Sequence, residues 1–132
     1  MRRFRFAPSL RLETREGSLA LWVAESRVQR LLGLTGRAGV PAGRGLLIPA
    51  CAAVHTWGMR VAIDVAFVEW PAGPVCRVLR LSEAVGPLRG ARLPGRAARR
   101  TAVIEAPAGT LGALGLGAAD ATVNFRSCPR TA

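Results

Sequence analysis

The stretch Val61-Ala-Ile-Asp-Val-Ala-Phe-Val68 decides the fold, because it is apolar at both odd and even positions and is interrupted only by Asp64. A strand with this pattern is buried on both of its faces, so other elements must cover it from two sides. Residues 70–74, Trp-Pro-Ala-Gly-Pro, predict a turn. Residues 75–81 are then the expected antiparallel partner of the buried strand.

Further short strands are expected on both sides of this pair. Residues 10–14 and 19–24 flank a Gly-containing turn and predict a hairpin, and three more strands are expected at residues 45–48, 102–106 and 122–125. Ser26-Arg27-Val28-Gln29 has capping-box spacing, which predicts a helix that ends at Gly33 to Gly36. A second short helix is expected after the turn at residues 107–112.

Length and pattern together predict one α+β domain over residues 1–132. We expect it to be β-rich, a small barrel-like mixed or antiparallel sheet with one or two short helices. The core is expected at about residues 19–123, with a long basic loop at 82–100 and a tail at 126–132.

The charge balance is strongly basic and suggests an anionic partner. The 19 basic residues are all arginine, against 8 acidic ones, which gives a net charge of +11. Residues 77–100 hold seven of these arginines and only one acid, Glu83. Such a field draws in anions, either a small anionic ligand or nucleic acid. Aromatic residues are only 5%, and no nucleic-acid docking motif is present, so the nucleic-acid interpretation rests on charge alone.

Cysteine usage and the N-terminal sequence predict a cytoplasmic protein. Cys51, Cys76 and Cys128 are odd in number and widely spaced, which favours neither a disulfide framework nor a metal site. No cofactor motif is found, no signal peptide is recognised, and no apolar run reaches the ~20 residues of a membrane span. The oligomeric state is left open.

His55 and Asp64 are the most conspicuous polar residues near the buried strand. A buried carboxylate costs several kcal/mol unless it is paired or hydrogen-bonded. Asp64 therefore either accepts backbone N–H groups or pairs with an arginine, or else it serves a pocket in which it can orient His55. His55 itself, the single histidine, is either a satisfied structural residue or a member of that pocket.

Five separated blocks carry a resemblance to a known family. In order they are Arg30-Leu-Leu-Gly-Leu-Thr-Gly-Arg37, Gly45-Leu-Leu-Ile48, Cys51 to Met59 with Ile63-Asp-Val-Ala-Phe67, Pro87-Leu-Arg89 and Val103-Ile-Glu-Ala-Pro-Ala-Gly109. This pattern resembles the uncharacterised family DUF192. The resemblance implies a small β-rich, barrel-like domain and supplies no activity. Its members often carry a signal peptide or lipid anchor, and none is recognised here, which favours the cytoplasm.

Carried over by position, the motif implies a pocket lined by six polar residues: Arg30, His55, Thr56, Asp64, Arg89 and Glu105. The leading hypothesis is a non-enzymatic binding module that holds a small polar or anionic ligand in a cleft near His55 and Asp64. A hydrolase-like enzyme with His55 as general base is the first alternative. Binding of nucleic acid or an acidic partner through residues 77–100 is the second.

Overall fold

The structure is a computed structural model that describes residues 10–24, 43–55, 61–71, 73–86, 89–95 and 97–128. The helix expected after Ser26 lies outside these residues, as do Arg30 and Thr56. The described elements are β1 (Leu10–Thr14), β2 (Gly17–Val23), β3 (Arg44–Ile48), β4 (Ala53–His55), β5 (Ile63–Glu69), β6 (Val75–Val85), β7 (Gly90–Arg92), η1 (Ala98–Arg100, a 3-10 helix), β8 (Thr101–Pro107), α2 (Thr110–Ala113) and β9 (Thr122–Ser127).

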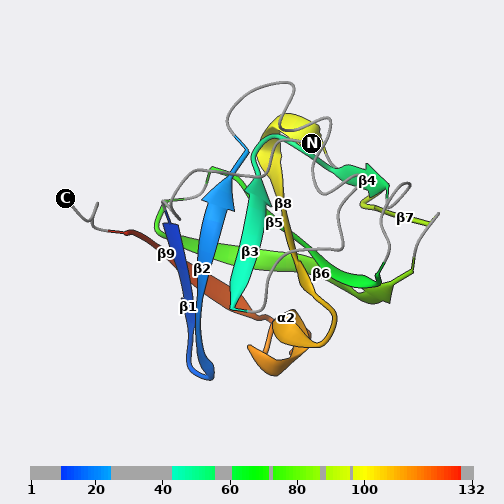
Figure 1. Cartoon of the computed structure of the whole chain (residues 1–132). Helices are drawn as coiled ribbons and strands as arrows, with labels where there is room; N and C mark the ends of the chain where they lie inside the picture. The colour runs from blue at the N-terminus through cyan, green and yellow to red at the C-terminus, as the bar shows by residue number, and fades with distance from the viewer. Residues whose placement is uncertain are drawn as a thin grey trace.

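Seven of these strands form a closed barrel in the order β1-β2-β3-β8-β5-β6-β9 (Figure 1). The expected hairpin is the β1–β2 pair, in which Leu10 lies opposite Leu21 and Thr14 opposite Gly17. β2 and β3 run parallel, and the other neighbours in the barrel are antiparallel. β9 closes the barrel because it pairs with β1 on one side and with the start of β6 on the other. The β-rich, barrel-like fold class predicted from the sequence is therefore confirmed.

β5 is the buried strand that the sequence predicted. It pairs with β6 and β8, and every residue from Ile63 to Val68 is buried. Because side chains alternate along a strand, Ala66 and Val68 pack into the barrel interior, whereas Val65 and Phe67 face outward. Both faces of β5 are therefore buried, as the sequence predicted: one by the barrel interior and the other by the apolar cluster outside the barrel wall.

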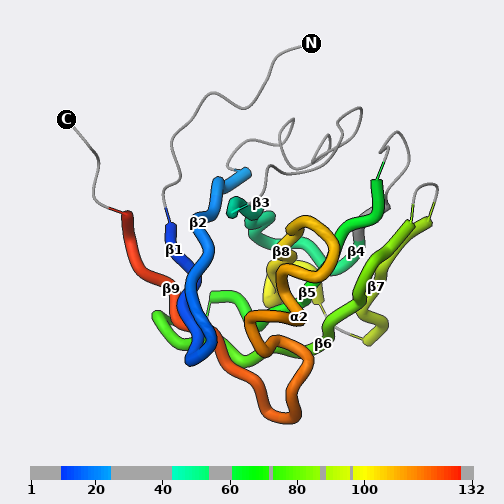
Figure 2. The backbone as a smooth tube through the Cα atoms, turned by 60° about the horizontal axis from the view of Figure 1, so that its bottom comes forward, coloured from blue at the N-terminus to red at the C-terminus, as the bar shows by residue number. Residues whose placement is uncertain are grey.

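The interior is closed at one end by α2 and the turn that follows it. Leu111, Leu114 and Leu116 belong to the same apolar cluster as the inward side chains of the strands. Figure 2, which brings this end of the barrel forward, shows α2 lying across the opening. A segment of four helical residues is too short to hold its shape alone, so its packing on the barrel end stabilises it.

The outer face of β5 is covered by a separate two-stranded sheet, β4–β7. Val54 lies opposite Ala91, and His55 lies opposite Gly90. Ala91 of β7 packs with residues on the outer side of the barrel wall, among them Leu46, Val65 and Val103. Figures 1 and 2 both show β4 and β7 next to each other beside the barrel. We call this side of the wall the outer face.

The segment expected to be a long loop over residues 82–100 is partly ordered into strands. β6 continues to Val85, and residues 90–92 form β7. The β5–β6 pairing shifts register between Phe67 and Val68 and again between Ile63 and Val65, and Ala84 has a φ of 50°. Such bulges break the two-residue alternation by which a strand is recognised in a sequence.

Candidate functional site

Asp64 is fully buried and ties three elements together. Its Oδ1 accepts the N–H of Ala84 in β6 at 3.0 Å, and its Oδ2 accepts the N–H of Leu111 in α2 at 3.0 Å. This is the structural alternative stated for the residue, a carboxyl group held by backbone N–H donors. A ligand-binding role for Asp64 stays a prediction, and the observed contacts do not depend on it.

Glu105 lies on the opposite side of the same sheet, on the outer face. It is opposite Leu46 of β3 and Val65 of β5, and both of those side chains belong to the outer apolar cluster. Its neighbours two residues away on β8 are Val103 and Pro107, so apolar groups surround it along and across the strands. Only 4% of Glu105 is exposed.

Among the described residues no hydrogen bond and no ion pair to this carboxyl group is found, but its oxygens are not among the fully buried side-chain atoms that lack a hydrogen-bond partner there, of which Glu13 Oε1 is the one example. Burial raises the pKa of Glu105 from 4.5 to about 7, because the apolar surroundings disfavour the charged form. Buried polar groups are almost always hydrogen-bonded in folded proteins. The burial of this carboxyl group therefore costs folding free energy.

Pairing of β4 with β7 places the backbone of His55 close to that of Arg89. His55 ends β4 opposite Gly90, and Arg89 immediately precedes Gly90. Of His55 the structure describes only the backbone, and Arg89 is exposed. Thus the backbones of two of the six predicted site residues, His55 and Arg89, lie at neighbouring positions of the β4–β7 sheet. Glu105 lies in the outer face, Asp64 lies on the opposite side of the sheet, and Arg30 and Thr56 are outside the described residues.

Trp22 is a site candidate that the sequence analysis did not name. Trp22 lies opposite Leu46, which in turn lies opposite Glu105, so the three form one row across β2, β3 and β8. The indole is half-buried and packs on the outer apolar cluster. Only the strand order reveals this row, because residues 22 and 105 are joined by no local pattern.

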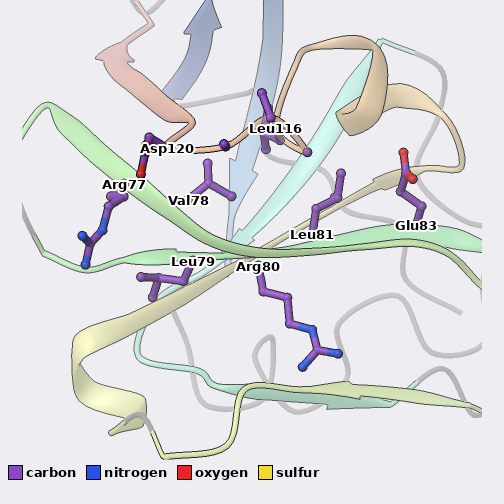
Figure 3. Close-up of a pocket in the computed structure, with 11 residues that line it drawn as sticks. Arg77, Val78, Leu79, Arg80, Leu81, Glu83, Leu116 and Asp120 are labelled. Atoms are coloured by element: carbon purple, nitrogen blue, oxygen red, sulfur yellow. The ribbon is translucent and has the colours of Figure 1, made fainter.

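An open depression of about 590 Å³ lies elsewhere, between β6 and the turn that follows α2 (Figure 3). Its walls come from residues 77–81, Glu83 and residues 116–120. In Figure 3 Val78 and Leu81 point to one side of β6 and Arg80 to the other. Since Val78 and Leu81 pack on the interior cluster, Arg80 belongs to the outer side. Two arginines and two acidic residues line the depression, so its charges do not favour either an anionic or a cationic ligand.

Exposed arginines gather on β6, β7 and η1. They are Arg77, Arg80, Arg92, Arg99 and Arg100. η1 lies against the β5–β6 turn, where the N–H of Trp70 donates to the carbonyl oxygen of Arg100 at 3.0 Å. Arg77 is at the same end, because its guanidinium lies 3.8 Å from Glu69 and its N–H donates to that carboxylate. The basic segment at residues 77–100 that the sequence analysis singled out therefore contributes exposed arginines to three elements, β6, β7 and η1.

The family comparison matches residues 10–123, most of the chain, to the DUF192 model, described as an uncharacterized ACR. The chain belongs to the DUF192 family. The match begins nine residues before the core that the sequence analysis expected, because it includes the β1–β2 hairpin. No curated protein matches this DUF192 chain.

Two solved structures share the fold. A protein of unknown function from Novosphingobium aromaticivorans is 17% identical, with a TM-score of 0.67 over 89% of this chain and 83% of that one. A proposed transcription regulator from Sinorhizobium meliloti is 20% identical, with a TM-score of 0.63 over 89% of this chain and 91% of that one. At these identities the likeness concerns the fold. Within the described part of the DUF192 chain, no helix has the length and apolar character needed to cross a membrane.

Proposed function

We propose that this protein is a binding module that holds a small polar or anionic ligand on the outer face of its barrel, beneath or beside the β4–β7 sheet. The observation that carries the proposal is Glu105, a buried carboxyl group with no partner among the described residues. A bound ligand supplies the missing hydrogen bonds. This shifts the hypothesis drawn from the sequence, in which the cleft lay near His55 and Asp64, because both oxygens of Asp64 are already used by backbone donors.

The surroundings support a polar ligand with an anionic part. The side chains around Glu105 in the barrel wall are apolar and buried, whereas β7 and the residue before it carry the exposed Arg92 and Arg89. Pockets for small molecules combine an apolar lining with a few polar groups that fix orientation. Guanidinium groups bind carboxylates and phosphates in two-bond geometry. His55, Thr56 and Arg30 remain the proposed further members of this site.

The first test is native mass spectrometry of untagged protein purified gently at moderate salt. We expect a discrete extra mass on the parent protein and its loss from Glu105→Leu, since leucine suits the apolar surroundings and removes both polar atoms. His55→Ala should lose the mass as well. Glu16→Gln, in the exposed β1–β2 turn, is the matched control and should keep it.

A bare parent protein would call for calorimetry against a broad metabolite panel on a sample shown to be folded. Absence of binding in both experiments would refute the binding module. Turnover of a generic ester, phosphoester or glycoside that is lost in His55→Ala would favour the hydrolase instead.

A second candidate function is favoured by the exposed arginines on β6, β7 and η1. Five guanidinium groups on adjoining elements form a basic surface suited to the phosphates of a nucleic acid, with Glu69 as an acid that already binds Arg77. This surface would bind through charge, without base recognition. Its affinity should fall steeply with salt and should not change in Glu105→Leu, which separates it from the ligand site.

A further inference from the structure

We infer that β6 accepts an extended peptide of another protein as an additional strand along its edge at residues 79–83, beside the depression of Figure 3. The peptide alternates acidic and aliphatic side chains. Glu105 does not line this depression, and β5 lies between its strand and β6. The inference therefore goes beyond the proposed function and does not depend on it.

The first step is that β6 has a strand partner on only one side over most of its length. β6 has 11 residues, Val75–Val85, and β5 pairs with it from Val78 to Val85. On the other side β9 pairs only with residues 75–77, after which the N–H of Val78 donates to the carbonyl oxygen of Ala121 at 2.9 Å. Within the part of the chain that the structure describes, no strand continues along this edge. Such an edge presents backbone N–H and C=O groups to an extended chain that reaches it.

The second step is that the chain on this side leaves room for another strand. From Ala121 back toward α2 it separates from β6, and the depression of about 590 Å³ lies between the two segments. The chain approaches β6 again at Gly112, where an added Cβ would collide with Glu83 Oε1. Between these two contacts the wall includes residues 117–119, Gly-Ala-Ala, which are all exposed. Side chains this small leave width for an incoming backbone.

The third step is the length of the open edge, which favours a peptide as the occupant. Residues 79–83 cover roughly 15 Å of extended chain. A small molecule satisfies one or two of the backbone groups along such a length, whereas a second extended backbone pairs with them in register. A second copy of this chain is disfavoured, because two molecules with a net charge of +11 repel each other.

The fourth step assigns the side chains of the peptide. Figure 3 shows Arg80 on one side of β6, and Leu81 on the other side with Leu116. Leu116 belongs to the interior apolar cluster and Leu81 packs against it, while Glu83 and Asp120 lie toward the two ends of the depression. Side chains alternate along an added strand, so one row lies on the side of the guanidinium group and the other on the side of the leucines. Acidic residues suit the first row and aliphatic residues the second.

The test is fluorescence anisotropy with the labelled peptide Glu-Val-Glu-Val-Glu-Val-Glu. The matched control replaces every valine by proline, which keeps the negative charges but removes backbone N–H groups and prevents regular strand pairing. We expect saturable binding of the valine peptide and binding of the proline peptide about tenfold weaker or worse. Amide hydrogen exchange followed by NMR is the second readout. Exchange at residues 79–83 should slow on binding, whereas exchange in β1, which has a strand on each side, should not change.

Two substitutions test the two sides of the site. Gly117→Leu places a large side chain in the depression, and the nearest atom to its Cβ would be Leu81 Cδ2 at 3.4 Å, an ordinary contact. It should weaken binding about tenfold or more, whereas Asn124→Leu, at an exposed position of β9, should bind like the parent. Arg80→Glu should weaken binding about tenfold more than Arg15→Glu, which makes the same change in net charge in the β1–β2 turn.

Each contrary outcome points to a different occupant. Equal binding of the valine and proline peptides would show that charge alone attracts the peptide, and the inference would then be wrong. It would also be wrong if the valine peptide did not bind, or if Gly117→Leu bound it as the parent does. Analytical ultracentrifugation without peptide tests the second copy: a dimer of the parent that Gly117→Leu dissociates would overturn the peptide as occupant. These results leave the ligand site at Glu105 to its own test.

Discussion

At the scale of single residues, Asp64 is a carboxyl group whose work is structural. It links β5 to β6 and to α2 through the backbone N–H groups of Ala84 and Leu111. Asp64→Asn replaces one acceptor by an amide N–H that faces a backbone donor. We expect this change to lower the free energy of unfolding by about 2–4 kcal/mol, because at least one buried donor loses its acceptor. Urea denaturation monitored by circular dichroism measures the loss.

Asp120 provides the control for this substitution. It is exposed and has a φ of 54°, a conformation that asparagine also tolerates. Asp120→Asn should change stability by no more than about 0.5 kcal/mol. If Asp64→Asn proves as stable as the parent, the two backbone hydrogen bonds do not hold the end of the barrel.

Glu105 makes stability depend on pH in a defined direction. Its pKa is raised from 4.5 to about 7 in the folded state by burial. Below about pH 4 the group is neutral in both the folded and the unfolded chain. Between about pH 4.5 and 7 only the unfolded chain ionises, so stability falls as the pH rises and levels off above about 7. The total loss should be on the order of 3 kcal/mol.

Glu105→Gln removes this titration and should therefore gain stability relative to the parent as the pH increases. We expect the difference between the two proteins to move in favour of the variant by about 3 kcal/mol between about pH 4 and pH 8. Glu16→Gln, at an exposed position, should follow the parent closely. Parallel stability curves for the parent and Glu105→Gln would show that the folded protein ionises Glu105 normally.

At the scale of elements, the parallel β2–β3 contact depends on Gly45. A Cβ atom at this position would lie 2.7 Å from Leu21 Cδ2, 2.9 Å from Leu19 Cδ2 and 3.2 Å from the backbone oxygen of Glu105. Both leucines are buried in the interior cluster, so they cannot simply turn away. Gly45→Ala should therefore cost about 1–3 kcal/mol through overpacking.

Thermal unfolding followed by circular dichroism tests this cost, with Gly86→Ala as the comparison. At Gly86 the nearest atom to an added Cβ is Arg89 Cγ at 4.0 Å, an ordinary contact. Gly86→Ala should shift the unfolding temperature little, whereas Gly45→Ala should lower it by several degrees. Equal shifts would mean that β2 and β3 yield to make room.

Elements with a strong apolar pattern could be predicted from the sequence, and those held by pairing alone could not. β5 and the β1–β2 hairpin follow from alternation and turn residues. β7 is Gly-Ala-Arg, with no apolar pattern, and it exists because it pairs with β4 and buries Ala91. The end of β6 was missed for a different reason, since the conformation of Ala84 breaks its periodicity.

At the scale of the whole molecule, the order of the strands in the barrel decides which residues lie side by side on one face. That order depends on pairing between strands that are far apart in the sequence. The placement of β8 between β3 and β5 sets Glu105 between Leu46 and Val65. Glu105 entered the set of candidate residues through its resemblance to a family motif, and its burial on the outer face was not visible in the sequence. Trp22 was missed because it joins that row only through β2–β3 pairing.

The chain has a net charge of +11, which could attract a polyanion to any part of the molecule. If phosphates bind instead to one basic surface, only the arginines of that surface should contribute to the affinity. The double variant Arg92→Gln/Arg99→Gln removes two charges from β7 and η1. Arg11→Gln/Arg15→Gln removes two exposed charges from the β1–β2 hairpin and is the matched control. Fluorescence anisotropy with a labelled single-stranded oligonucleotide measures the affinity of each protein over a series of salt concentrations.

If the surface on β6, β7 and η1 binds the phosphates, the logarithm of the affinity should fall linearly with the logarithm of salt concentration. The first double variant should then reduce this slope by about one for each phosphate that is no longer neutralised. The hairpin variant should keep the parent slope, because it removes the same net charge from a different place. Identical slopes for the two variants would mean that the chain attracts polyanions through its total charge and has no basic binding surface.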